Sequence, residues 1–82
     1  MADQDLLREI ALALVKNPDK VQVKRSVDEM GVLLRLYVAK EDMPLVIGSR
    51  GATANLLRAI MKLAGMNVGA RISVKIEEPV MS

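Results

Sequence analysis

The 82-residue sequence contains no cysteine and no histidine. Their absence excludes disulfides, thiol nucleophiles, metal sites built on thiolate or imidazole ligands, and the usual general base near neutral pH. The adjacent acidic residues lie at expected turns and element ends, without a nucleophile or base beside them: Asp28-Glu29, Glu41-Asp42 and Glu77-Glu78. We therefore expect no catalytic residue, no metal site and no cofactor, and we predict that the protein is not an enzyme.

Aromatic residues are almost absent, because the chain has no Phe, no Trp and a single tyrosine, Tyr37. RRM and OB-type surfaces stack bases on aromatic rings, so this scarcity disfavours both. Tyr37 alternates with Leu34 and Leu36, which places it on the back of a predicted strand rather than in a binding groove. Walker and GxGxxG patterns are also missing, which excludes P-loop and Rossmann nucleotide sites.

Long apolar runs are missing as well. The segment from Ile10 to Val15 is far too short to span a bilayer or to act as a secretory signal. We expect no membrane span and a cytoplasmic location. A net charge of +2 permits a polyanionic partner without requiring one, and a chain of this length predicts one domain with a modest core.

Hydrophobic periodicity predicts alternating helices and strands. Leu6, Leu7, Ile10 and Leu14 recur at helical spacing, and Asp42 is expected to cap a second, short helix. The predicted helices cover residues 4–16, 43–47 and 52–64, and the predicted strands cover 21–27, 32–38 and 71–76, with a four-residue hairpin connection at 28–31. This order, αββααβ, predicts an α+β fold in two layers, with a three-stranded sheet covered on one face by helices.

The most informative segment runs from Leu45 to Ala54, where two glycines frame Ser49 and Arg50 directly before a helix. Glycines permit positive φ and leave the main chain bare, so backbone N–H groups can turn outward at a helix start, where the helix dipole favours an anion. This pattern is typical of a loop that binds phosphate groups. On these residues alone, a plain helix-turn-helix corner remains equally open.

Together with its flanking helices and the following strand, the run Val46-Ile47-Gly48-Ser49-Arg50-Gly51 resembles the GxxG signature of KH RNA-binding domains. The element order matches the type II KH fold. Further matches make the chain similar to the small bacterial single-KH proteins of the KhpA family: Asn17-Pro18-Asp19, Glu41-Asp42-Met43, Thr53-Ala54 and Leu57-Arg58. The resemblance implies one KH domain over residues 1–82. It departs from the family in carrying one basic loop residue instead of the frequent two, and Ala at position 52 where relatives commonly have Arg.

The resemblance also implies a mechanism, in which a KH domain clamps about four nucleotides of single strand between its GxxG loop and an apolar groove. Here the amides of residues 49–52 would face phosphates, and Arg50 would add charge. The groove would be lined by Val46, Ile47 and part of strand 32–38. The expected RNA-binding residues are Val46, Ile47, Gly48, Ser49, Arg50, Gly51, Ala52, Asn55, Arg58 and Lys62. The implied role is that of a bacterial RNA chaperone in post-transcriptional regulation.

The long helix at 52–64 is apolar over about half its circumference, because Leu56, Ile60 and Leu63 extend the expected core stripe. Either the N-terminal helix covers this surplus or a partner does. The resemblance implies pairing with a second copy or with another KH protein. An alternative function is therefore a protein-interaction module on a KH scaffold, whose partners supply the RNA affinity.

Four basic residues can gather on the outer face of the sheet: Lys24, Arg35, Arg71 and Lys75. Because Glu77 and Glu78 lie near them, the pattern favours an ordinary solvated surface there.

Overall fold

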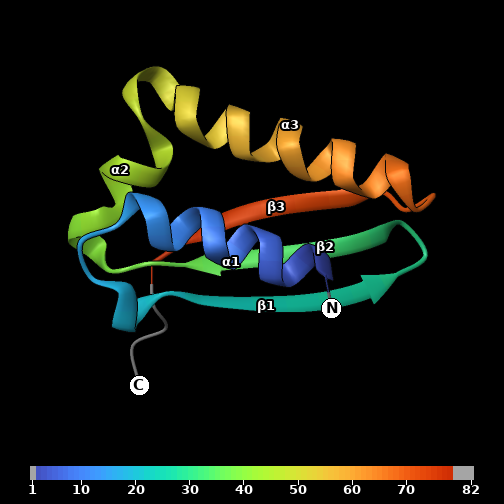
Figure 1. The fold of residues 1–82 in the computed structure, drawn as a ribbon, viewed down its shortest axis with the longest axis horizontal. Helices are drawn as coiled ribbons and strands as arrows, with labels where there is room; N and C mark the ends of the chain where they lie inside the picture. The colour runs from blue at the N-terminus through green and yellow to red at the C-terminus, as the bar shows by residue number, and fades with distance from the viewer. Residues whose placement is uncertain (1, 79–82) are drawn as a thin grey trace.

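The computed structural model describes residues 2–78. Its main elements are α1 (Ala2–Leu14), β1 (Gln22–Asp28), β2 (Gly31–Tyr37), α2 (Met43–Ile47), α3 (Ala52–Asn67) and β3 (Ile72–Glu77). Short 3₁₀ turns η1 (Pro18–Lys20), η2 (Lys40–Asp42) and η3 (Ser49–Gly51) precede β1, α2 and α3. Figure 1 shows the helices gathered against the three-stranded sheet. The predicted α+β architecture and its order αββααβ are confirmed.

The sheet has the order β1-β2-β3, so β2 lies in the centre. β1 and β2 are antiparallel, whereas β2 and β3 are parallel because the chain crosses back through α2 and α3 before entering β3. The predicted four-residue hairpin connection is wrong: Asp28 pairs with Gly31, so only two residues form the turn. Gly31 has φ +123°, and a Cβ there would lie 2.4 Å from the Arg71 carbonyl oxygen, so this glycine serves strand pairing and a close backbone approach.

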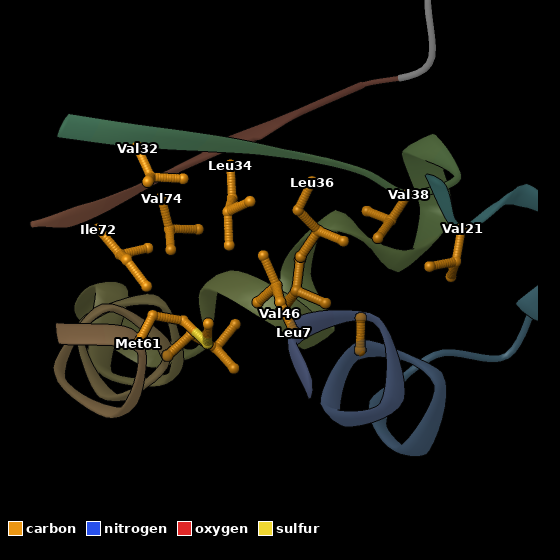
Figure 2. Close-up of a cluster of buried hydrophobic side chains, with 12 residues drawn as sticks. Leu7, Val21, Val32, Leu34, Leu36, Val38, Val46, Met61, Ile72 and Val74 are labelled. Atoms are coloured by element: carbon orange, nitrogen blue, oxygen red, sulfur yellow. The ribbon is translucent and has the colours of Figure 1, made fainter. Parts of the chain in front are cut away.

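One face of the sheet packs against the helices to form the core. Figure 2 shows side chains of β2 and β3 pointing towards α3, α2 and α1, with Leu34 and Leu36 in the middle of the layer. On the helix side, Leu7, Val46 and Met61 are fully buried. Burial of these side chains contributes roughly 1.5–3 kcal/mol each, which fixes the position of the α2–α3 turn relative to the sheet.

The contact face of α1 is narrower than the sequence predicts. Leu7 and Ala11, four residues apart, are fully buried, whereas Leu6 and Leu14 are more than one third exposed. α1 packs mainly against β1 and α3, with Leu7 and Ala11 as its buried stripe and Ile10 and Leu12 partly buried against the core.

Asp42 precedes α2 but does not cap it through its side chain. Its fully buried carboxylate instead accepts hydrogen bonds from the Lys16 N–H (3.1 Å), the Asn17 N–H (2.9 Å) and the Asn17 side-chain amide (3.1 Å). Burial acts to raise the pKa of Asp42, but these hydrogen bonds and the nearby Lys16 charge outweigh it, and the net shift is downward. Asp42, which the sequence predicts to cap α2, therefore links the segment after α1 to the start of α2 through hydrogen bonds.

Candidate nucleic-acid interface

The turn between α2 and α3 is held by backbone geometry. The N–H of Gly48 donates to the Pro44 carbonyl at 2.9 Å and ends α2. Three of the four turn residues then have positive φ: Gly48 (φ 76°), Arg50 (φ 56°) and Gly51 (φ 75°). This sequence of angles reverses the chain within four residues and starts α3 at Ala52.

The two glycines have different surroundings. A Cβ on Gly48 would lie 2.3 Å from Thr53 Oγ1 and 2.8 Å from the Thr53 backbone nitrogen, so α3 occupies that space. A Cβ on Gly51 would meet no atom within 4 Å. Gly48 is therefore needed for packing as well as for its backbone angles, whereas the space next to Gly51 is open to a ligand.

The four amides expected to face phosphates divide into two pairs. The Gly51 N–H donates to the Gly48 carbonyl at 3.2 Å, and the Ala52 N–H donates to the Ser49 carbonyl. Among residues 2–78, neither the Ser49 N–H nor the Arg50 N–H donates a hydrogen bond. The turn thus leaves two adjacent amides free, and both belong to exposed residues.

Arg50 is the one non-glycine residue with positive φ among the residues that the structure describes. The left-handed conformation costs an L-residue with a side chain roughly 1–2 kcal/mol, and such strain concentrates at functional sites. The Arg50 side chain is exposed. Its guanidinium therefore adds a positive charge next to the two free amides.

A polar row continues from the turn along α3. After the exposed Ala52, the exposed polar residues Asn55, Arg58 and Lys62 recur at helical spacing. The Arg58 Nε donates to the Val74 carbonyl of β3 at 3.3 Å, and an Arg58 terminal nitrogen lies 3.4 Å from Asn55 Oδ1. Asn55 and Arg58 thus line a seam between α3 and β3.

The β3 strand contributes a free backbone edge to this seam. The Arg71 and Glu77 carbonyls accept hydrogen bonds from Val32 and Val38, so odd-numbered residues of this segment face inward to β2. Backbone groups alternate along a strand, so those of Ile72, Val74 and Ile76 face outward. Apart from the Val74 carbonyl, which accepts from Arg58, these donors and acceptors can pair with base edges, as an edge strand pairs with another chain. This edge could not be predicted from the sequence, because it arises from the parallel pairing of β3 with β2.

At the far end of α3 the seam widens into an open hollow of about 660 Å³. It is lined by Lys62, Met66, Gly69, Ala70, Arg71, Ile72 and Ser73. Lys62, the last residue of the polar row, therefore lies where this hollow begins, with Arg71 on its opposite wall. The seam carries positive charge at the turn, in its middle and at this end.

Two expected groove residues lie deeper than the sequence predicts. Val46 is fully buried in the core, and Figure 2 shows it pointing towards the sheet side chains. Ile47 is half-buried at the edge of the core. Val46 supports the turn from beneath, and only Ile47 of the pair presents apolar surface. Thr53 was missed by the sequence analysis, although it packs against Gly48 and holds the turn on α3.

The surplus apolar face of α3 is not covered by α1. Although the two helices pack together, Leu56 remains 60% exposed and Leu63 65% exposed, while Ile60 is half-buried. Met66, one turn further, is also exposed. These residues form an exposed apolar row on α3.

Within residues 2–78, no three acidic side chains come together in a way that could hold a metal ion. The same part of the chain contains no helix with the length and hydrophobicity needed to cross a bilayer.

A family model and the sequences of known proteins both match this chain over most of its length. The model of the KhpA/KhpB KH-domain family matches residues 4–76. The chain is 41% identical over 73 residues to RNA-binding protein KhpA of Clostridium acetobutylicum, covering 89% of this chain and 97% of that protein. It is 35% identical over 79 residues to RNA-binding protein KhpA of Bacillus subtilis, covering 93% and 98%.

Among solved structures, the chain resembles part of Aquifex aeolicus Era bound to GDP·AlF₄⁻, with a TM-score of 0.67 and 17% sequence identity. The alignment covers 98% of this chain and 31% of Era. At this identity the likeness shows a shared fold.

Proposed function

Because the chain belongs to the KhpA/KhpB KH-domain family, which is not an enzyme family, we propose that it is an RNA-binding protein. It grips a short single-stranded segment, with the turn at residues 48–51 holding the sugar-phosphate backbone and the α3–β3 seam receiving the bases. One KH domain spanning the 82 residues carries this function without a cofactor.

The observation that carries the proposal is the exposed turn with two free amides. Ser49 and Arg50 offer adjacent N–H donors to phosphate oxygens, and the Arg50 guanidinium adds charge attraction. The open space at Gly51 allows a sugar-phosphate chain to approach the main chain closely. Gly51 and Ala52 shape the turn, because their own amides already have acceptors.

The chemistry of the α3–β3 seam is better suited to binding RNA bases than to binding a further stretch of the sugar-phosphate backbone. Ile47 supplies apolar surface, Asn55 supplies amide donors and acceptors, and the outer edge of β3 supplies backbone groups. With Tyr37 95% buried on the other side of the sheet, recognition would depend on shape and hydrogen bonds rather than on aromatic stacking. Arg58 and Lys62 would contact the phosphates of the RNA strand where it leaves the turn.

We further propose that two copies pair through the exposed apolar row on α3, or that this row meets another KH protein. Leu56 and Leu63 are exposed one above the other along the helix, which is unusual for large aliphatic side chains without a partner. We propose that the protein acts in the cytoplasm. We propose that its role is that of an RNA chaperone in post-transcriptional regulation, since one KH domain contacts only a short RNA segment and binds it weakly.

The test is RNA affinity after reversal of the turn's charge. In the Ser49→Asp/Arg50→Asp variant, two carboxylates would repel phosphates, and we expect binding of a short single-stranded oligoribonucleotide to weaken by at least about tenfold. The fold should persist, because Asp tolerates the left-handed conformation of position 50.

The matched control is Lys20→Asp/Lys40→Gln, which changes the net charge by the same amount at exposed positions outside the turn. Its affinity should stay near that of the wild type. If RNA affinity survives the acidic turn while partner assembly remains tight, the alternative function holds instead, in which the chain is an interaction module and its partners supply the affinity.

A further inference from the structure

The sheet face opposite the helices carries a row of three cations at one level. Register pairs Lys24 of β1 with Arg35 of β2, and Arg35 with Lys75 of β3. Side chains of directly paired residues lie on the same face about 5 Å apart at Cβ, so the row crosses the whole sheet within roughly 10 Å. All three residues are exposed. We call Lys24, Arg35 and Lys75 the cationic row.

The row is only partly neutralised by its own sheet face, because one acidic residue pairs with one of the three cations. The neighbouring positions towards the hairpin are Ser26, Leu33 and Ser73, and those on the other side are Gln22, Tyr37 and Glu77. Glu77 is the one acidic residue among them, and its carboxylate lies 3.6 Å from the Lys75 ammonium. Asp28, at the hairpin end, accepts a hydrogen bond from the Met30 N–H instead.

Three like charges in register destabilise a sheet slightly, so their alignment needs a reason beyond folding. Lys24 lies over the Tyr37 ring, with its ammonium 5.5 Å from the ring centroid, and this contact holds Lys24 against the sheet. A shallow depression of about 550 Å³ is lined by Lys24, Arg25, Ser26, Arg35 and Tyr37. Tyr37 itself is 95% buried and presents no ring for stacking. The face therefore suits phosphates and not bases.

The cationic row and the α3–β3 seam meet at the outer edge of β3. Arg58, in the seam, donates to the carbonyl of Val74, and Lys75 is the next residue on the strand, with its side chain on the opposite face of the sheet. Two cations thus flank the same edge at the same level. An RNA strand leaving the seam can bend around β3 and continue across the sheet along one line of positive charge.

We propose that the cationic row is a second RNA-contact surface, which binds the phosphate backbone without base specificity. This inference rests on the proposed RNA-binding function and extends it. A segment of about four nucleotides occupies the turn and seam alone, whereas a longer strand also reaches Lys75, Arg35 and Lys24. RNA affinity is then length-dependent, and the additional affinity is strongly salt-dependent.

The experiment compares oligouridylates of about five and about fifteen nucleotides. In the variant Lys24→Gln/Arg35→Gln/Lys75→Gln, affinity for the longer strand should fall on the order of tenfold, while affinity for the shorter one stays within about twofold. For the longer strand, the slope of log affinity against log salt should become shallower by about 2, since each phosphate contact to single strands contributes about 0.7. Thermal stability should change little, because the repulsion removed with the three like charges offsets the loss of the Lys24–Tyr37 and Lys75–Glu77 contacts.

The matched control is Lys16→Gln/Lys20→Gln/Lys40→Gln, which removes three exposed cations that lie outside the sheet face. Equal losses in both triple variants would overturn the inference, because general charge would explain the effect. So would unchanged binding of the longer strand in the row variant. If Ser49→Asp/Arg50→Asp still abolishes short-strand binding in that case, the proposed function stands and only the second surface fails. If the wild type binds neither strand, the proposed function itself fails.

Discussion

Gly48 and Gly51 share a positive φ but differ in what surrounds them. Gly48 has ψ near 180°, a region open essentially to glycine alone, and Thr53 fills the space where a Cβ would go. Gly51 is in the left-handed helical region, which asparagine also adopts, and its surroundings are empty. Gly48 is therefore required by the fold, whereas the space next to Gly51 is the space proposed for the sugar-phosphate chain.

Substitutions at these two glycines should therefore have different consequences. Gly48→Ala should lower the free energy of unfolding by about 3 kcal/mol or more, because of backbone strain and the contact with the Thr53 backbone. Gly51→Asn should cost less than about 1 kcal/mol yet weaken RNA binding by roughly tenfold, because its side chain fills the space offered to the sugar-phosphate chain.

Urea denaturation and RNA titration of both variants check this separation. A Gly51→Asn protein that binds RNA like the wild type would mean that the open space is not used. A Gly48→Ala protein of unchanged stability would contradict the packing argument.

Elements far apart in the sequence are joined by a single carboxylate, Asp42, which fixes the end of α1 to the start of α2 and so to the turn. Its folded pKa lies below the ordinary value of 3.8. For a lowered carboxyl pKa, the stabilisation is fully present above the unfolded value and is lost as pH falls through the folded value. Asp42 therefore stabilises the fold above about pH 4 and progressively less below it.

The Asp42→Asn variant should melt several degrees below the wild type near pH 7, because the amide cannot replace the charged acceptor of three hydrogen bonds. Below about pH 4 the difference should shrink, because the unfolded wild type then binds a proton at Asp42 while the folded state, with its lowered pKa, does not, and this removes part of the stabilisation. Thermal melts over this pH range measure it. Glu41→Gln, an exposed neighbour, is the control and should show little difference at any pH. A difference in melting temperature between Asp42→Asn and the wild type that is as large near pH 3 as near pH 7 would contradict this role.

Local pattern predicts the elements well but not their contacts. Hydrophobic alternation and helical spacing located all six main elements within three residues at each end, and the glycine spacing located the turn. The pattern could not show that the Asp42 carboxylate bonds to Lys16 and Asn17 rather than to α2, because a capping residue and a tertiary clamp look alike in sequence. Nor could it show that Val46 is core, since an apolar residue next to a binding loop suits a groove equally well.

In the whole molecule, the cationic row lies on the open sheet face, whereas the seam and the exposed apolar row both lie along α3 and adjoin at Met66. The turn and seam lie along α3 and the edge of β3, the cationic row crosses the open sheet face, and the exposed apolar row runs along α3. Pairing of two copies through α3 would place two RNA-binding sites in one dimer. Such a pair raises the effective concentration of the second site and compensates for the weak binding of one KH domain.

The pairing prediction concerns Leu56 and Leu63. Replacing both with glutamate should shift a wild-type dimer to monomer, because buried like charges at a two-fold contact repel each other and lose solvation. Light scattering at several concentrations measures the mass. The fold should persist, since both side chains are mainly exposed. A wild type that stays monomeric at high concentration, or a variant that stays dimeric, would contradict pairing through this row.

The most direct test of the central claim is an amide NMR titration of the ¹⁵N-labelled protein with a short single-stranded oligoribonucleotide. We expect the Ser49 and Arg50 amide signals to move most and to shift downfield as their N–H groups acquire phosphate acceptors, with smaller changes at Asn55, Arg58 and Val74 along the seam. Unmoved Ser49 and Arg50 signals at saturation, with the changes gathered elsewhere, would contradict it.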